Sequence, residues 1–131
     1  MFYFDANTCI YYLNGKSNKI KEKILATPPN KIAIPSIVKA ELILSAYKSN
    51  NKQGTLEKVE KFLMPYEIIP FEDQVTYDYA DIRSYLESIG KIIGPNDLLI
   101  AAITRFHNAI LVTNNINEFS RVPDLKYEDW F

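Results

Sequence analysis

The fold is decided by residues 31–49, KIAIPSIVKAELILSAYKS, where a short apolar strand passes directly into a helix. Residues 31–34 favour a strand because they are mostly apolar, and Pro35 ends it because proline cannot donate to a sheet hydrogen bond. Ser36 then stands at the N-cap of a helix that we expect to extend to about Ser49. A strand followed at once by a helix is the unit from which parallel α/β sheets are built.

The same alternation continues on both sides of this stretch. Further strands are predicted at short apolar runs, at residues 2–4, 66–69 and 109–113. Further helices are predicted at residues 7–13, 17–26 with Ser17 as its cap, 56–64, 72–89 and 97–106. Strands that are apolar throughout indicate a sheet covered on both faces. We therefore predict a three-layer α/β/α sandwich with a mainly parallel central sheet, formed as one domain over residues 1–131.

The composition excludes several classes of protein. With 47% hydrophobic and 24% charged residues, the chain is expected to fold rather than remain disordered. Its one cysteine, Cys9, cannot form an internal disulfide, and a single histidine, His107, leaves no His/Cys cluster for zinc. No run approaches the roughly 18 apolar residues of a membrane span, and the N-terminus lacks the pattern of a secretion signal. We expect a cytoplasmic protein with no membrane contact.

The charge balance bears on nucleic-acid binding. Fifteen basic and 16 acidic residues give a net charge of −1, which does not suit binding through broad attraction to phosphates. If RNA is the substrate, the basic contacts must be local. Candidates are Lys16, Lys19, Lys21, Lys23, Lys39, Lys48, Lys52, Arg83, Lys91 and Arg105. For each of them, a place on a solvated helix face remains the alternative.

Polar residues stand where the predicted strands end. Asp5 follows the first strand, Asp97 opens a predicted helix, and Asn114 and Asn115 follow the strand at 109–113. Ligands of open parallel sheets bind outside the carboxyl ends of the strands. The sequence therefore predicts a polar site at this edge of the sheet.

Glu41 is the unusual acid, because its neighbours over residues 38–44 are almost all apolar. Its face of the helix is therefore not an ordinary solvated one, and Lys39 is too close in sequence to pair with it along the helix. Each acid also has a structural explanation. Asp5 can cap a helix, Asp97 can stabilise a first helical turn, and Glu41 can pair with a distant lysine.

Convergence of Asp5, Glu41 and Asp97 would have a chemical consequence. At about 4 Å and an effective dielectric of about 20, each pair of carboxylates repels by roughly 4 kcal/mol. Such a site takes up protons or a divalent cation, and ligands that are all oxygen favour Mg²⁺, with Mn²⁺ as a substitute. A cation held in this way activates water and neutralises developing charge in phosphodiester hydrolysis.

Four segments carry motifs in a recognisable order. They are residues 4–10, FDANTCI; residues 36–42, SIVKAEL; residues 94–102, GPNDLLIAA; and residues 112–123, VTNNINEFSRVP, followed by the ending EDW at 128–130. In this order they resemble the PIN-domain ribonucleases, most closely the VapC toxins of bacterial toxin–antitoxin pairs. The resemblance covers the whole chain and implies a Mg²⁺-dependent endoribonuclease.

The resemblance also implies roles for the acids. Asp5, Glu41 and Asp97 become the metal-binding and catalytic acids, and Glu118 is expected to be the fourth catalytic acid. The family's fourth acid comes from the C-terminal segment, and Asn114 and Asn115 occupy the start of that segment, where some members carry an aspartate. Ala6 stands where a threonine is common, which removes a hydroxyl group but no ligand.

Residues around these acids are expected to orient ligands or water. By the same resemblance they are Asn7, Thr113, Asn114 and Asn115. For Asn7, an ordinary place at the start of a helix remains equally open.

The resemblance implies partners as well. A VapB-like antitoxin is expected to bind a groove beside the acids, and RNA is the expected substrate. Candidate groove residues are Tyr11, Tyr12, Leu13, Leu44 and Tyr47, with a core position as the alternative for Leu13 and Leu44. We also expect a homodimer and a heteromer with the antitoxin.

Two other functions remain to be weighed. A phosphatase similar to the haloacid dehalogenases would use Asp5 as a nucleophile, but this chemistry needs a second aspartate at position 7, where Asn7 stands. A non-catalytic α/β interaction module would use the acids only as dispersed caps.

Overall fold

A computed structural model describes all residues, 1–131, and contains one five-stranded sheet in which every neighbouring pair is parallel. The strands are β1 (Phe2–Phe4), β2 (Ile32–Pro35), β3 (Glu67–Ile69), β4 (Ile110–Val112) and β5 (Lys126–Glu128), in the spatial order β3-β2-β1-β4-β5. The helices are α1 (Ala6–Leu13), α2 (Asn18–Ala26), the 3-10 turn η1 (Pro29–Lys31), α3 (Ser36–Tyr47), α4 (Lys52–Leu63), α5 (Val75–Ser88), α6 (Pro95–Phe106) and α7 (Ile116–Phe119). The parallel α/β sheet expected from the sequence is therefore confirmed.

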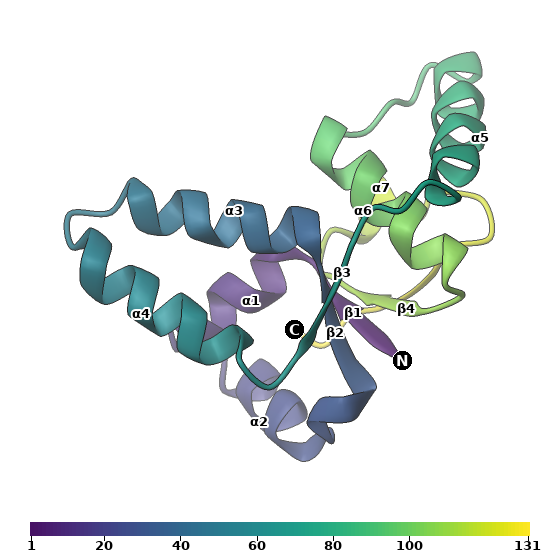
Figure 1. Cartoon of the computed structure of the whole chain (residues 1–131). Helices are drawn as coiled ribbons and strands as arrows, with labels where there is room; N and C mark the ends of the chain where they lie inside the picture. Colours follow the sequence, from purple (N-terminus) through teal and green to yellow (C-terminus); the bar gives the residue numbers. More distant parts are fainter.

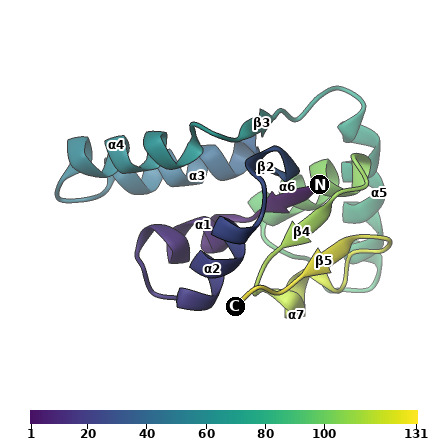
Figure 2. The same ribbon diagram turned by 90° about the horizontal axis from the view of Figure 1, so that it is seen from below.

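Helices cover the sheet from both sides. In Figure 1, α1 to α4 lie on one side of the strands and α5 and α6 on the other, which gives the expected three layers. All four residues of β2 are buried, as are Phe4 in β1 and Leu111 in β4. Figure 2 shows that α3 and α4 form a hairpin that extends away from the sheet. None of the helices combines the length and the apolar character needed to cross a membrane.

Most helix ends follow from local signals, but two expectations were wrong. Ser17 caps α2 as expected, since its hydroxyl accepts a hydrogen bond from the Ile20 amide at 3.2 Å. Ser36 is not an N-cap: Pro35 holds that position, and Ser36 is the first helical residue. Helix α4 begins at Lys52 rather than residue 56, because the Asn51 side chain caps a polar first turn that has no apolar periodicity.

The C-terminal segment contains two elements that the sequence did not predict, α7 and β5. Strand β5 pairs with β4 at the edge of the sheet, and all three of its residues are exposed. An edge strand of three exposed residues carries neither an apolar run nor alternating burial, so periodicity could not indicate it.

Arg105 joins three parts of the chain and is not a free RNA contact. Its guanidinium lies 2.6 Å from Asp78 and 2.9 Å from Asp81 of α5, and 3.2 Å from the carbonyl oxygen of Pro123. Because the arginine side chain is only 13% exposed, Arg105→Leu leaves a half-buried aspartate unpaired. We expect it to lower the free energy of unfolding by about 2–3 kcal/mol in urea denaturation. Arg83→Leu is the control, because it breaks only exposed contacts, the 3.7 Å pair with Glu87 and the 2.7 Å hydrogen bond to the Tyr79 hydroxyl, and it should change stability by less than about 1 kcal/mol.

Candidate active site

Asp5 is held firmly at the carboxyl end of β1. It is 5% exposed and caps α1, with Oδ1 accepting hydrogen bonds from the Thr8 amide at 2.9 Å and the Thr8 hydroxyl at 2.7 Å. The Thr113 hydroxyl makes a further hydrogen bond to this carboxylate. Burial raises the pKa of Asp5, and these hydrogen bonds oppose the rise. The structural role expected as an alternative for Asp5 is thus real, and the cap also fixes the orientation of the carboxylate.

Glu41 lies one and a half turns into α3 and is half-buried. Burial raises its pKa, and the negative charge of Asp5 raises it further, while a hydrogen bond from Asn96 lowers it. Its Oε1 atom is buried and has no hydrogen-bond partner in the protein. A buried carboxylate oxygen without a partner is costly, so this atom is free to accept a hydrogen bond or to bind a cation.

Asp97 occupies the first turn of α6, just after Gly94 and Pro95. A side chain at position 94 would be crowded, since its Cβ atom would lie 3.3 Å from Asp97 Oδ2. Burial raises the pKa of Asp97 to about 7, helped by a hydrogen bond with Glu118 and by the charges of Glu118, Glu41 and Asp5. Mutual charge effects of this kind require the four acids to lie near one another.

Glu118 and Asn115 come from the segment after β4. The Asn115 amide nitrogen Nδ2 donates to Glu118 Oε2 at 2.9 Å, and the Asn115 backbone donates to the Thr113 hydroxyl at 2.9 Å. Thr113 therefore connects Asp5 with the segment that carries Glu118. The expected fourth acid is placed beside Asp97 rather than beside Asp5.

One cavity unites most of the expected site residues. It has a volume of about 200 Å³ and is lined by Asp5, Ala6, Asn7, Glu41, Asp97 and Asn115. Its walls come from the end of β1, from α1, α3 and α6, and from the segment after β4. Residues far apart in sequence thus meet at the carboxyl edge of the sheet, where the sequence predicted a polar site.

The donor set of this cavity suits a hard divalent cation. The acidic side chains that line it present carboxylate oxygens, and Glu41 Oε1 has no hydrogen-bond partner within the protein. No group of three His, Cys, Asp or Glu side chains is arranged as a metal-ligand set in this structure. A cation held by these walls would therefore need oxygen ligands from water or substrate as well as from the chain.

Several expected residues lie elsewhere. Asn114 is exposed and does not line the cavity, so its expected role beside the acids finds no support in its position. The five candidate groove residues do not share one groove. Tyr12 and Leu13 line a hollow between α1, α2 and α4, Leu44 lies near the acids, and Tyr11 packs against Phe131.

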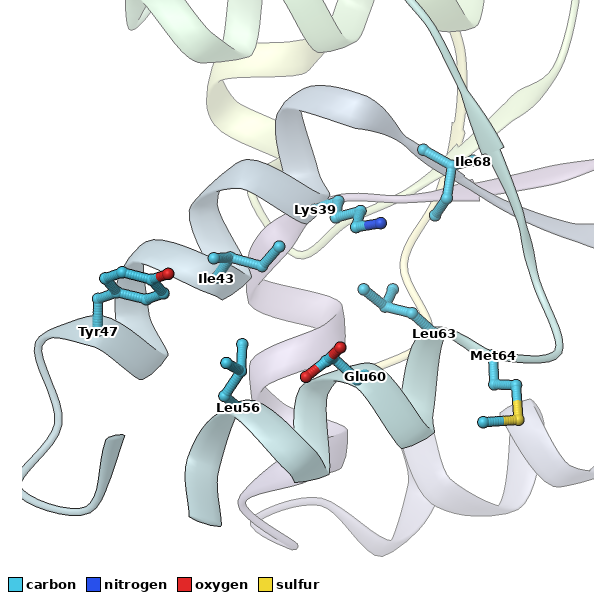
Figure 3. Close-up of a pocket in the computed structure, with 8 residues that line it drawn as sticks. All are labelled: Lys39, Ile43, Tyr47, Leu56, Glu60, Leu63, Met64 and Ile68. Atoms are coloured by element: carbon cyan, nitrogen blue, oxygen red, sulfur yellow. The ribbon is translucent and has the colours of Figure 1, made fainter. Parts of the chain in front are cut away.

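Tyr47 lies in a different hollow, between α3 and α4 (Figure 3). With a volume of about 480 Å³ it is larger than the acidic cavity, and its charged wall residues are Lys39 and Glu60. Lys39, Ile43 and Tyr47 recur every four residues and share one face of α3 (Figure 3). Glu41 is two residues from Lys39 and from Ile43, so helical geometry places it on another face. The volume of a hollow therefore does not identify the candidate active site in this protein, whereas the convergence of the acidic side chains does.

Two residues that contact the acids were missed by sequence reasoning. Thr8 is fully buried, and its hydroxyl lies 2.7 Å from Asp5 Oδ1 and 2.9 Å from the Val112 carbonyl oxygen. Asn96 hydrogen-bonds to Glu41. The signal for both was their position in the motif segments, three residues after Asp5 and one before Asp97.

The fold and the cavity together define a class: parallel α/β proteins with a cluster of carboxylates at the carboxyl edge of the sheet. Comparison with known proteins gives the family, since the PIN domain matches residues 2–125. Ribonuclease VapC2 of Rickettsia felis is 43% identical over 131 residues, which cover 99% of this chain and 98% of that protein. The tRNA(fMet)-specific endonuclease VapC of Salmonella typhimurium is 34% identical over 98% of this chain and 97% of its own length.

A solved structure agrees with these relatives. The crystal structure of VapBC2 from Rickettsia felis bound to a DNA fragment from their promoter has a chain that matches with a TM-score of 0.93 and 43% identity over the full length of both chains. The chain belongs to the PIN-domain family and, within it, to the VapC ribonucleases. PIN-domain nucleases generally depend on divalent metal ions, which agrees with the oxygen donors of the cavity.

The raised pKa of Asp97 predicts how stability changes with pH when no metal is bound. The folded-state pKa of about 7 lies above the ordinary value of 3.8, so between these values the folded chain binds more protons than the unfolded chain. Stability is therefore present at low pH and lost as the pH rises through 7. Allowing for solvent screening, we expect a loss of about 1–2 kcal/mol between pH 5.5 and 8 in urea denaturation with EDTA. Asp97→Asn should lose less stability between pH 5.5 and 8 than the parent does. If the variant loses as much as the parent, groups other than Asp97 cause the pH dependence.

Proposed function

We propose that residues 1–131 form one PIN-like ribonuclease domain that acts as the toxin of a VapBC-type pair and cleaves RNA with Mg²⁺. One observation carries the proposal: Asp5, Glu41 and Asp97, from three separate elements, line one small cavity in which Glu41 Oε1 has no partner. Dispersed caps, as in a non-catalytic module, would not converge in this way. Asn7 at position 7 likewise disfavours the phosphatase mechanism.

Asp5, Glu41 and Asp97 would hold the cation, and Mn²⁺ is a plausible substitute. When bound, the ion supplies Lewis acidity, activating water and neutralising charge on the phosphodiester group. The chain's own residues prepare the site. Thr8 and Thr113 orient Asp5 through hydrogen bonds, and Glu118 shares a hydrogen bond with Asp97, so that this pair can hold one proton between them.

Asn115 and Asn7 support the cavity from two sides. Asn115 positions Glu118 through its side-chain amide, and Asn7 lines the cavity with an exposed amide that can donate to a phosphate oxygen. The four acids Asp5, Glu41, Asp97 and Glu118 are therefore proposed as catalytic residues.

A VapB-like antitoxin is the proposed protein partner, as the structure from Rickettsia felis is that of a VapBC2 complex. The hollow that fits an amphipathic segment lies between α1, α2 and α4 and has a volume of about 530 Å³. Tyr12, Leu13 and Leu25 give it apolar walls, and Lys58 and Lys61 stand at its border. Of the candidate groove residues, Tyr12 and Leu13 are retained as anchors. Homodimerisation and a heteromer with the antitoxin complete the proposed assembly, in the cytoplasm.

The test is RNA cleavage by the purified chain with Mg²⁺, with Mn²⁺ and with EDTA. We expect cleavage with either ion and none with EDTA. Sequencing the new RNA ends from total RNA identifies the substrate, and tRNA(fMet) is included because the Salmonella typhimurium relative is specific for it. Intact RNA under every metal condition would favour the non-catalytic module.

A further inference from the structure

One shallow hollow continues from the acidic cavity, and a second hollow adjoins the first. The first, of about 330 Å³, shares Ala6, Asn7 and Glu41 with the cavity and reaches Lys48. The second, of about 170 Å³, begins where the first ends and reaches Lys58 on α4. Their walls overlap at Ile10 and Ser45. Together they form one continuous depression, which we call the α1–α3 groove.

The groove follows the periodicity of its two helices. On α3, Glu41, Leu44, Ser45 and Lys48 stand at positions i, i+3, i+4 and i+7 and therefore share one face. On α1 and its C-cap, Asn7, Ile10 and Asn14 repeat the same spacing. Lys48 lies seven residues beyond Glu41, so it stands about 10 Å along the helix axis from the acid.

The charge changes along this path. Glu41 is the only acidic residue of the groove walls, and it stands at the end next to the cavity. Lys48 and Lys58 form no ion pair and no hydrogen bond within the chain. Lys52 differs, since its ammonium group lies 3.9 Å from the ring centre of Tyr47. The unpaired ammonium groups of Lys48 and Lys58 can therefore contact the phosphates of a nucleic-acid strand that extends from the acidic cavity along the groove.

The groove walls also suit the other parts of a nucleotide. Ile10 and the 53% exposed Leu44 offer apolar surface against which a base or ribose can pack. Asn14, Ser45 and Thr55 offer amide and hydroxyl groups that can bond ribose hydroxyls or phosphate oxygens. The hollow assigned above to the antitoxin is larger; it shares Leu13 and Lys58 with the far end of the groove and has no wall residue in common with the acidic cavity. Continuity with the cleavage site therefore favours RNA as the occupant of the groove.

We propose that the α1–α3 groove binds the single-stranded RNA segment on one side of the cleaved phosphate, with Lys48 and Lys58 contacting successive parts of its backbone. The proposed role of the groove rests on the proposed ribonuclease function. RNA binding in the groove would explain how a protein of net charge −1 holds RNA, because the basic contacts are placed locally beside the acids.

The experiment compares RNA cleavage by the parent chain and by Lys48→Gln/Lys58→Gln. We expect KM to rise roughly 3- to 10-fold with kcat nearly unchanged, because phosphate contacts contribute binding without touching the reacting bond. The slope of log KM against log salt concentration should fall by about 0.7 for each lysine. Substrates trimmed on the 5′ or the 3′ side of the cleavage site are tested as well. Trimming the side that lies in the groove should remove the difference between parent and variant.

Lys31→Gln is the matched control, because Lys31 is exposed and stands just before β2, at the opposite edge of the sheet. An equal effect of this control would show general charge attraction and overturn the groove. A double variant that cleaves like the parent, or that loses only the binding of the antitoxin, would also overturn it. Absence of cleavage by the parent would instead refute the proposed function, and the groove with it.

Discussion

Asp97→Asn is expected to abolish RNA cleavage, lowering kcat/KM by at least about 10³-fold, or roughly 4 kcal/mol of transition-state stabilisation. The substitution removes an anionic ligand and the group that shares a hydrogen bond with Glu118. The amide has nearly the same size and can still bond to Glu118, so the fold should persist. The measurement is single-turnover cleavage of the RNA identified by end sequencing, with Mg²⁺ at saturating concentration.

Two further readouts separate loss of chemistry from loss of folding. Mg²⁺ or Mn²⁺ at millimolar concentration should raise the melting temperature of the parent, and Asp97→Asn should lose most of this shift. Expression of the parent in a bacterial host should arrest growth, whereas the variant should be harmless. Asp73→Asn, at an exposed position outside the cavity, should behave like the parent. Equal toxicity of parent and Asp97→Asn would rule out metal-dependent cleavage as the cause of arrest.

The convergence of the acids could be predicted from sequence because the topology is parallel. Asp5 follows β1, and Thr113 and Asn115 follow β4, the neighbouring strand. Parallel neighbours place their carboxyl ends at one edge, so order along the chain was enough to bring these residues together. Glu41 was found through the conflict between its charge and its apolar neighbours, and the structure shows the cause as an unpaired buried oxygen.

What could not be predicted depends on packing between distant segments. The roles of Thr8 and Asn96 arise from hydrogen bonds to acids, and hydroxyl and amide residues near helix starts are ordinarily assigned to capping. The candidate groove residues were chosen for aromatic and apolar character alone. Tyr47 and Leu44 are only three residues apart on α3, but they point into different hollows. Which side of a helix meets which neighbour is a property of the assembled layers.

Glu41→Gln is expected to have opposite effects on stability and on function. Burial and the charge of Asp5 both disfavour the ionised form of Glu41; the hydrogen bond from Asn96 offsets part of that cost, and the Oε1 atom has no partner. Replacing the carboxylate by a neutral amide should therefore raise the free energy of unfolding of the metal-free protein at pH 7.5, by less than about 1 kcal/mol after solvent screening of this partly exposed group. The same change removes a cation ligand, so cleavage should fall by at least about 10²-fold.

The pH dependence gives this prediction its sharpest test. Because the pKa of Glu41 is raised, the acid takes up a proton as the pH falls, and the stability gained by Glu41→Gln should shrink from pH 7.5 to pH 5. Urea denaturation with EDTA at both pH values measures the gain, and Glu22→Gln, on the exposed face of α2, provides the matched control. A metal-free variant less stable than the parent at pH 7.5 would mean that the hydrogen bond from Asn96 outweighs the cost of burying the Glu41 charge. Glu41 would then be a structural residue, and the cavity would lose the group that most clearly requires a cation.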